Sequence, residues 1–597
     1  MTPVGNFFFD ICGRLTGRKR LSPLPTSFPS GQLPQVFCDF FTRLVSDIRS
    51  KMDLVSPAVI VSNDSVPPCS FLSFQSISET DLKAIILKSK PTTCPLDPIP
   101  THLFVECLDL ILPHVTQIVN QSLSSGVFPT LFKNAIVKPL LKKPSLDQNI
   151  LKNYRPVSNL SFLSKIMEKV VLKQLLAYLN TNDLMSHSQS AYRPAHSTET
   201  TLVKVTNDLL KSLDEGNVSV LTLLDLSAAF DTIDHVTLLR RLNIHYGISG
   251  SALSWFKSYL LGRTLTVLVD GQTSTSVPLT FGVPQGSVLG PVLFTMYTEP
   301  LSTLIQSHSV SSQSFADDTQ LYDSTSPDKA VTVISTIETC ITDVKTWMVQ
   351  NKLKLNDEKT EALLFKKKTT SFPADQPSSL RVGDSDISFV QSARNLGFTV
   401  TSDMSLDKHI SNTCRSAYFE LRKIGAIRQY LSVQTTNTLV CAFVLSKLDY
   451  CNALLSGCPL HLLQKLQKVM NSAARLVLKA RKRDHATPLL RTLHWLPVKA
   501  RIEYKLCTLC FNYFSGSCPS YFSDLLTTYT PRRQLRSSSD SRIFSIPKVK
   551  TKSYGERSFS FCAPSTWNSL PHHIRHIQSL SSFKRTLKTY LFQKHFS

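Results

Sequence analysis

The sequence predicts a mixed α and β fold that becomes mainly helical after residue 400. Residues 218–224 form an apolar run rich in β-branched side chains, which is typical of a buried strand. Residues 265–269 form a second such run, and Asp270-Gly271 closes it with a turn signal. Apolar residues between Ile337 and Met348 recur at helical spacing.

The ends of the chain follow other patterns. Residues 1–80 are rich in Pro and Ser and have weak periodicity, and Thr80-Asp81 is expected to cap a short helix over residues 82–87. Apolar residues from Leu462 to Leu476 recur at the spacing of one long amphipathic helix. The segment 528–556 contains many Ser and Arg, so we expect a basic loop there.

The positive charge is concentrated in the last third of the chain. The formal net charge is +23. Residues 401–597 hold 30 Lys and Arg against 9 Asp and Glu, whereas residues 1–400 hold 36 against 34. Such a basic region beside a nearly neutral one favours a polyanionic partner. Solubility alone is the simpler explanation, but the uneven distribution favours nucleic acid.

The fourteen cysteines show no paired framework, as expected of reduced thiols inside a cell. Cys507 and Cys510 form a C-x-x-C pair without a second pair at zinc-finger spacing, so we expect core thiols on one helix face. No stretch approaches the roughly 20 apolar residues that span a bilayer. Phe7-Phe8-Phe9 is followed by an acidic residue and makes a poor signal peptide. We expect an intracellular protein, in the nucleus or cytoplasm or both, with no membrane partner.

Two acidic segments are the candidates for chemistry. Asp225 ends the apolar run 218–224, and Asp317 and Asp318 lie between short apolar flanks, as at a hairpin tip. Three carboxylates at strand ends would hold two Mg²⁺ ions, which prefer oxygen ligands. Two such ions activate a 3′-hydroxyl and stabilise a leaving pyrophosphate. Each segment alone is more often a strand boundary or a solvated turn.

The surrounding residues form ordered blocks over residues 90–400. The blocks before residue 200 are Gly126 to Pro129, Ala135 to Pro139, Asn153 to Leu160, and Gln189 to Arg193 followed by Ser197-Thr198. The later blocks are Asp225 to His235, Gly282 to Pro291, Phe315 to Asp318, Leu355 to Glu361, and Asn395 to Phe398. Together they resemble the fingers blocks and motifs A to E of the reverse transcriptases of non-LTR (LINE-type) retrotransposons, near the jockey-like and chicken-repeat-like groups.

The resemblance implies a right-hand polymerase of the α+β class, with fingers, a palm containing an antiparallel sheet, and a helical thumb. It implies a linker-like remnant at 1–85, fingers and palm at 86–400, a thumb at 401–500 and a basic, mainly helical C-terminal region at 501–597. In this family an endonuclease domain usually precedes the polymerase, and residues 1–85 resemble the linker after it. We therefore expect a chain that lacks this domain, and target-site nicking is not supported.

The implied activity is RNA-directed DNA synthesis from dNTPs, with an RNA template and a DNA primer or target DNA as partners. Asp225, Asp317 and Asp318 would be catalytic and would bind two Mg²⁺ ions, with Mn²⁺ possible in their place. The resemblance implies four further roles: a metal ligand in the Leu226 carbonyl, a proton donor to pyrophosphate in Lys359, triphosphate contacts from Lys138 and Arg155, and nucleotide contacts from Phe230, Gln285 and Gly286. Phe230 would act as the steric gate against a 2′-hydroxyl.

The implied thumb carries a basic helix that would contact nucleic-acid phosphates, which give affinity without sequence information. Its candidate residues are Lys465, Lys468, Arg475, Lys479, Arg481, Lys482 and Arg483.

The chain departs mildly from the family pattern. Ala191-Tyr192 occupies the position where the family more often has Gly-Phe, and residues 95–98 occupy the position where G-P-D-G is more usual. An alternative to the active enzyme is a catalytically inactive remnant that only binds RNA or DNA. An RNA-dependent RNA polymerase is disfavoured by Phe230 and by the sequence of motif B. The sequence leaves the oligomeric state open.

Overall fold

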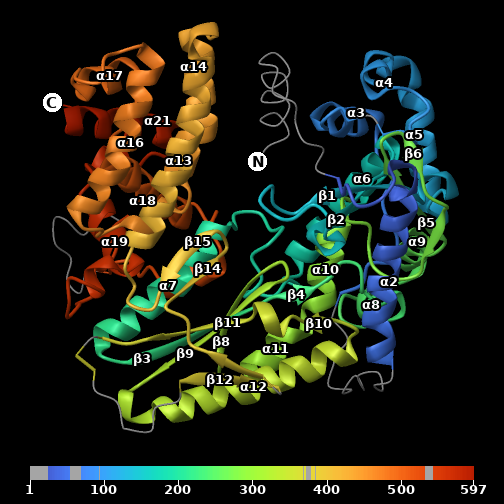
Figure 1. Cartoon of the computed structure of the whole chain (residues 1–597), viewed down its shortest axis with the longest axis horizontal. Helices are drawn as coiled ribbons and strands as arrows, with labels where there is room; N and C mark the ends of the chain where they lie inside the picture. The colour runs from blue at the N-terminus through green and yellow to red at the C-terminus, as the bar shows by residue number, and fades with distance from the viewer. Residues whose placement is uncertain are drawn as a thin grey trace. The chain divides into compact units, whose positions relative to one another are not determined.

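The computed structural model describes residues 24–53, 69–92, 94–367, 369–370, 378–383, 385–530 and 542–596. The chain divides into two compact units, each built from segments distant in sequence. The first unit comprises Met1–Ser186, Leu226–Ile305 and Thr342–Asn356, and the second comprises His187–Asp225, Gln306–Ile341 and Asp357–Ser597. Helices and strands occur in both units (Figure 1), so the predicted mixed class is confirmed.

The first unit contains a mixed five-stranded sheet. β1 (Asn134–Leu141) pairs antiparallel with β2 (Tyr154–Asn159) and parallel with β5 (Arg263–Val269). β5 also pairs antiparallel with β6 (Gln272–Thr273) and β7 (Val277–Leu279). The strand predicted at 265–269 is confirmed, and Asp270-Gly271 forms the turn that joins β5 to β6, where both residues have positive φ.

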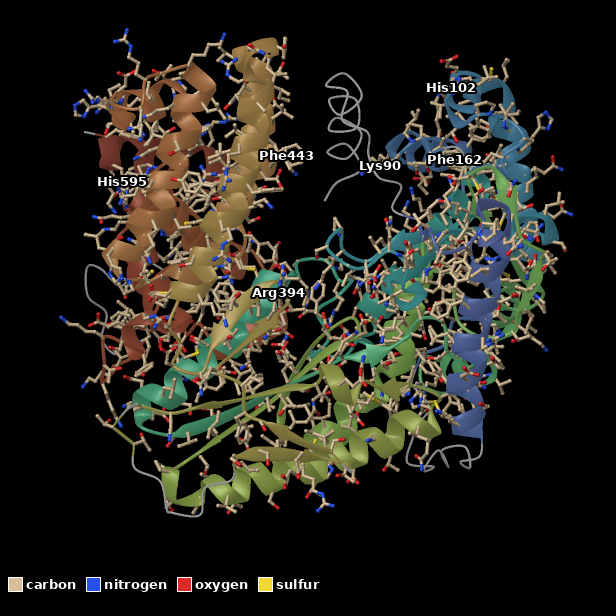
Figure 2. All side chains as sticks on the ribbon, viewed as in Figure 1. Lys90, His102, Phe162, Arg394, Phe443 and His595 are labelled. Atoms are coloured by element: carbon tan, nitrogen blue, oxygen red, sulfur yellow. The ribbon has the colours of Figure 1, made fainter. Side chains whose placement is uncertain are left out.

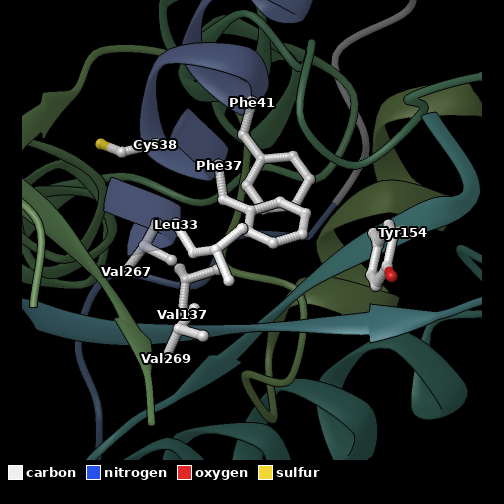
Figure 3. Close-up of a cluster of buried hydrophobic side chains, with 8 residues drawn as sticks. All are labelled: Leu33, Phe37, Cys38, Phe41, Val137, Tyr154, Val267 and Val269. Atoms are coloured by element: carbon white, nitrogen blue, oxygen red, sulfur yellow. The ribbon is translucent and has the colours of Figure 1, made fainter. Parts of the chain in front are cut away.

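A hydrophobic cluster joins α2 (Leu33–Asp53) to this sheet (Figure 3). Phe37 of α2 is fully buried, and its ring meets that of Tyr154 edge-on with centroids 4.9 Å apart. Val137 and Val267 contribute from β1 and β5. A segment expected to be linker-like therefore forms part of a core, because the sheet supplies the apolar partner that α2 needs.

The first unit also contains several helices and a short strand pair. β4 (Leu226–Ser227) pairs antiparallel with β10 (Lys354–Leu355). Its helices include α3 (Glu79–Lys88), α4 (Thr101–Glu106), α5 (Leu108–Ser125), α6 (Phe162–Thr181), α8 (His235–Ile244), α9 (Gly250–Leu260) and α10 (Gly290–Thr298). α11 (Pro300–Ser307) and α12 (Ala330–Gln350) have residues in both units, and α12 confirms the helix predicted between Ile337 and Met348.

The predicted helix over residues 82–87 is confirmed, but its predicted cap is wrong. α3 begins at Glu79, and the side chain of Ser78 accepts the Asp81 N–H. Ser78 has the extended backbone that an N-cap residue requires, whereas Thr80 already lies inside the helix.

The second unit is organised around an antiparallel four-stranded sheet in the order β11-β3-β9-β8. β3 (Val218–Leu224) confirms the buried strand predicted there and is central, between β11 (Glu361–Phe365) and β9 (Asp318–Thr325). β8 (Ser311–Phe315) is the last strand in that order. Two hairpins follow, formed by β12 (Ser379–Val382) with β13 (Ser385–Ser388) and by β14 (Ser392–Asn395) with β15 (Phe398–Thr401).

Helix α7 (Thr198–Glu215) packs against β3 and β8 and also binds residues from the C-terminal part of the chain. The buried Asp214 carboxylate accepts the N–H groups of Lys550 and Thr551 at 2.8 and 2.7 Å. Asn207 accepts the Ser560 N–H at 2.9 Å. The C-terminal residues are therefore an integral part of the second unit.

The rest of the second unit is mainly helical, as predicted. Its helices are α13 (Asp407–Ile427), α14 (Val433–Val440), α15 (Ser446–Asp449), α16 (Leu460–Leu478), α17 (Ala486–Thr492), α18 (Val498–Phe514), α19 (Phe559–Asn568), α20 (His572–Arg575) and α21 (Leu580–Phe596). α21 packs against α18, where Glu503 lies 2.9 Å from Lys594 and 3.5 Å from His595, which Figure 2 labels. Residues 531–541 of the predicted basic loop lie outside the described residues, as do residues 1–23.

Cys507 and Cys510 are both buried on α18, which confirms the expectation of core thiols. Burial raises the pKa of Cys510 far above its usual value. Every cysteine in the described ranges is a free thiol. Within those ranges, no helix combines the length and apolar character needed to cross a membrane.

Candidate active site

The sheet of the second unit brings the predicted carboxylates to one end of two paired strands. Leu224 of β3 pairs with Thr319 of β9, so Asp225 and Asp318 occupy the next positions of the same ladder. Phe315 pairs with Asp318 to close the β8–β9 hairpin, and Ala316 and Asp317 form its turn. β3 is buried along almost its whole length, so it holds Asp225 on a rigid element.

The three carboxylates lie close enough for their charges to act on one another. The pKa of Asp318 is raised to about 6, first by partial burial of its carboxylate and then by the negative charges of Asp317 and Asp225. The positive charge of Lys359 acts in the opposite direction. The charge of Asp317 also reaches Tyr192, whose pKa is raised first by burial and then by this carboxylate.

Lys359 contacts one of these carboxylates directly. It lies in the short 3-10 turn Asp357–Lys359, immediately before Thr360 and β11. Its ammonium donates to Asp225 Oδ2 at 2.8 Å, and the two side chains are 62% and 29% exposed. An ion pair this exposed contributes about 0.2–1 kcal/mol to stability. It therefore matters mainly because it places the Lys359 ammonium beside Asp225.

The donor set suits a divalent metal ion, because hard cations prefer carboxylate oxygens and would relieve the mutual repulsion of three neighbouring negative charges. The described side chains contain no group of three His, Cys, Asp or Glu residues that is already arranged to hold a metal ion. The assignment of Asp225, Leu226, Asp317 and Asp318 as metal ligands therefore stays a prediction.

In the first unit, Gln285 and Gly286 form the predicted turn before α10. Gly286 has φ +117°, and a Cβ at this position would lie 2.6 Å from the Ser158 carbonyl oxygen. The Ser158 N–H donates to the Gln285 carbonyl at 2.7 Å. The glycine is thus required for close packing of the turn on β2.

The Gln285 side chain is also held in place. Its Nε2 donates to Asp231 Oδ2 at 2.6 Å. Burial raises the pKa of Asp231 to about 7, although this hydrogen bond lowers it. Asp231 therefore orients Gln285 within the turn.

Phe230 is half-buried, and its ring stacks on that of Phe294 in α10 at 4.7 Å between centroids. The Phe230 carbonyl accepts the Val283 N–H at 2.9 Å, which fixes its backbone beside the turn. Packing in a core and a role as steric gate are both compatible with this position.

Lys138 and Arg155 are both exposed on the β1–β2 ladder. Lys138 pairs with Val157, and Leu140 pairs with Arg155. The two basic side chains are therefore diagonal neighbours on the same face, as two groups that share one polyanionic ligand would need to be.

One buried carboxylate of the first unit is not among the predicted site residues. Glu168 of α6 is fully buried, and its Oε2 accepts the N–H groups of Val288 and Leu289 at 2.6 and 3.0 Å. These amides lie between the Gln285-Gly286 turn and α10. The sequence feature that could have drawn attention to Glu168 is that it is an acidic residue within the largely apolar segment 162–179.

Comparison with known proteins identifies the central part of the chain. Residues 141–400 match the family model described as reverse transcriptase (RNA-dependent DNA polymerase). Over these residues the chain is similar to that family. The resemblance identified from the sequence blocks is confirmed.

The curated relatives of the chain carry matching names. The "RNA-directed DNA polymerase from mobile element jockey" of Drosophila melanogaster is 27% identical over 347 residues, which is 57% of this chain and 37% of that protein. The "Probable RNA-directed DNA polymerase from transposon BS" of the same species is 28% identical over 337 residues, 55% of this chain and 35% of the relative. The chain spans less than half the length of these relatives.

The basic residues predicted to bind nucleic acid lie after the matched region 141–400. α16 ends at Leu478, and Lys479 caps it in the left-handed conformation. The prediction that Arg481, Lys482 and Arg483 belong to the helix is therefore wrong, because the chain turns away at Lys479. Arg475 donates to the Asp484 carbonyl, and Lys465 lies 3.4 Å from Asp407, whereas Lys468 is exposed.

Proposed function

We propose that the chain is an RNA-directed DNA polymerase of a non-LTR retrotransposon, which extends a primer 3′ end with dNTPs on an RNA template. The observation that carries this proposal is the ladder register that sets Asp225 beside Asp318, with Asp317 in the adjoining turn. This arrangement lies within the region that matches the reverse transcriptase family.

Asp225, Asp317 and Asp318, with the Leu226 carbonyl, would hold two Mg²⁺ ions, or Mn²⁺ in their place. When bound, these ions supply positive charge that favours the ionised 3′-hydroxyl and the leaving pyrophosphate. Lys359 is placed beside Asp225 at 2.8 Å. From there its ammonium would donate a proton to the pyrophosphate oxygen released when the bond between the α- and β-phosphates breaks.

Residues of the first unit would bind the incoming nucleotide. Lys138 and Arg155 would contact its triphosphate, and the planar guanidinium of Arg155 suits two phosphate oxygens at once. Phe230 would lie beneath the sugar and exclude a 2′-hydroxyl. Gln285 and Gly286 would contact the nucleotide and template, with Gln285 oriented by Asp231.

The assignments of regions follow from the same proposal. Residues 86–400 would form fingers and palm in a right-hand arrangement, and residues 401–500 would form the thumb that follows the primer–template. Lys465, Lys468, Arg475 and the cluster from Lys479 to Arg483 would neutralise phosphates, so binding should weaken steeply as salt rises.

The proposal is tested by primer extension with the purified protein on a poly(rA)–oligo(dT) duplex with Mg²⁺ and dTTP. Extension that disappears in Asp317→Ala supports RNA-directed DNA synthesis and the role of the aspartate together. A folded protein that binds the duplex but does not extend it would overturn the proposal, leaving a retroelement remnant that binds RNA or DNA.

A further inference from the structure

The turn that carries the adjacent aspartates is bound by a side chain from outside its hairpin. Gln189 Oε1 accepts the Ala316 N–H at 2.9 Å, and Gln189 Nε2 donates to the Ala316 carbonyl at 3.2 Å. One amide side chain therefore satisfies both backbone groups of the residue that immediately precedes Asp317. The Gln189 side chain is buried, since only 7% of the residue is exposed.

Ala316 needs such a partner because its backbone is in an unfavourable conformation. Its φ is +60°, in the left-handed region that residues with a Cβ rarely adopt. Strained conformations of this kind persist where surrounding contacts determine them. A change in the Ala316 backbone would redirect Asp317 and Asp318, which follow it directly.

Gln189 is itself rigidly placed. Ser190 N–H donates to the Ser314 carbonyl at 2.9 Å, and Ser314 N–H donates to the Ser188 carbonyl at 2.8 Å. Residues 188–190 thus run along the outer side of β8. The Ser190 hydroxyl also lies 3.2 Å from the hydroxyl of Tyr521, a buried residue of the C-terminal part of the second unit.

We propose that Gln189 is a positioning residue, which holds Ala316 in the left-handed conformation and thereby sets the orientation of Asp317 and Asp318 for catalysis. The inference deepens the proposed polymerase function and rests on it. Gln189 contacts no reacting atom and acts only through the turn.

A second buried glutamine provides a matched comparison. Gln313 lies on β8, three residues before Ala316, and is 5% exposed. Its Oε1 is buried and accepts no hydrogen bond from any described residue. Gln313→Met therefore makes the same change of side chain at a similarly buried position of the same hairpin. It removes no hydrogen bond to the turn.

The test compares Gln189→Met, Gln189→Glu and Gln313→Met with the unchanged chain. Methionine keeps the length of the side chain and removes both hydrogen bonds to Ala316, together with the bond that Oε1 accepts from the Ala191 N–H at 2.9 Å. Glutamate keeps the acceptor for the Ala316 N–H but loses the donor to its carbonyl, and it serves as the second variant if Gln189→Met folds poorly. We measure amide hydrogen exchange at Ala316, and kcat and KM for dTTP on poly(rA)–oligo(dT).

We expect Gln189→Met to raise the exchange rate at Ala316 about tenfold or more and to lower kcat about 10- to 100-fold, with KM nearly unchanged. Gln189→Glu should show the same changes, because its second carboxylate oxygen would face the Ala316 carbonyl oxygen and repel it, and Gln313→Met should show neither. Exchange at Ala316 that does not change in Gln189→Met would overturn the proposal. So would an equal loss of kcat in Gln313→Met, or a rise in KM with kcat unchanged.

The exchange measurement separates this inference from the proposed function. Suppose that the unchanged chain extends no primer while exchange at Ala316 rises only in the Gln189 variants. The proposed polymerase function is then wrong, but the proposal that Gln189 fixes the conformation of Ala316 is supported.

Discussion

Replacing Glu168 should separate the loss of hydrogen-bond acceptors from the loss of a charge. Its Oε2 accepts three hydrogen bonds, from the N–H groups of Val288 and Leu289 and from the Tyr259 hydroxyl at 3.2 Å. Its Oε1 accepts from Ser164 at 3.3 Å. A glutamine in the same rotamer can place its carbonyl oxygen where Oε2 lies and donate from its amide nitrogen to the Ser164 hydroxyl.

The magnitudes of the two changes therefore differ. Glu168→Ala leaves two buried amides without an acceptor, at about 1–3 kcal/mol each, so the free energy of unfolding should fall by about 2–6 kcal/mol. Glu168→Gln keeps these acceptors and should change it by about 1 kcal/mol or less. An exposed glutamate of the first unit, Glu106, serves as the control, and Glu106→Ala should stay within about 0.5 kcal/mol.

The pH dependence has a defined sign. Burial raises the pKa of Glu168, against the opposing effects of Arg263 and of the hydrogen bonds. The folded state thus binds this proton more tightly than the unfolded chain, and stability is lost as pH rises above 4.5, the ordinary value. Glu168→Gln should therefore gain stability relative to the unchanged chain as pH rises.

Urea unfolding at pH 5 and pH 8, followed by tryptophan fluorescence, measures these differences. Trp255 stacks on Tyr259 with centroids 5.5 Å apart and reports on this site. Equal losses in Glu168→Ala and Glu168→Gln would refute the argument from unsatisfied amides. A change below about 0.5 kcal/mol in Glu168→Ala would refute it as well.

Three further changes test neighbouring parts of the first unit. Gly286→Ala should destabilise by about 1–3 kcal/mol in thermal unfolding, because φ is +117° and the new Cβ would meet the Ser158 carbonyl at 2.6 Å; an unchanged melting temperature would contradict this. Phe230→Leu should raise the ratio of rNTP to dNTP incorporation about tenfold or more, measured in parallel extensions. An unchanged ratio would contradict the role of Phe230 as a steric gate. Asp231→Asn should flatten the decline of stability between pH 4 and pH 7, because the pKa of Asp231 is raised to about 7 and its protonated form favours folding; an unchanged slope in urea unfolding would count against this.

Local sequence patterns predicted the elements that carry the aspartates. β3 has the bounds of the apolar run 218–224, and the aspartates at 317 and 318 lie at a hairpin turn as expected. These predictions succeeded because strand burial and turn formation depend mainly on residues close in sequence.

The features that could not be predicted depend on contacts between distant segments. Gln189 meets Ala316 across 127 positions, and Asp214 binds Lys550 across 336. α2 forms against a sheet more than 80 residues away in sequence. The end of α16 at Lys479 is set by a backbone conformation that periodicity alone does not specify. Sequence blocks identified the family without revealing any of these links.

The central claim is most directly tested by comparing Asp225→Asn with Asp323→Asn in primer extension. Both aspartates belong to the same pair of strands, but Asp323 pairs with Val220, well away from the strand ends that carry Asp225 and Asp318. We expect Asp225→Asn to lower the extension rate by about 1,000-fold or more while duplex binding is retained, and Asp323→Asn to stay within about threefold. Equal rates for the two variants, or full activity in Asp225→Asn, would contradict an active site built on these aspartates.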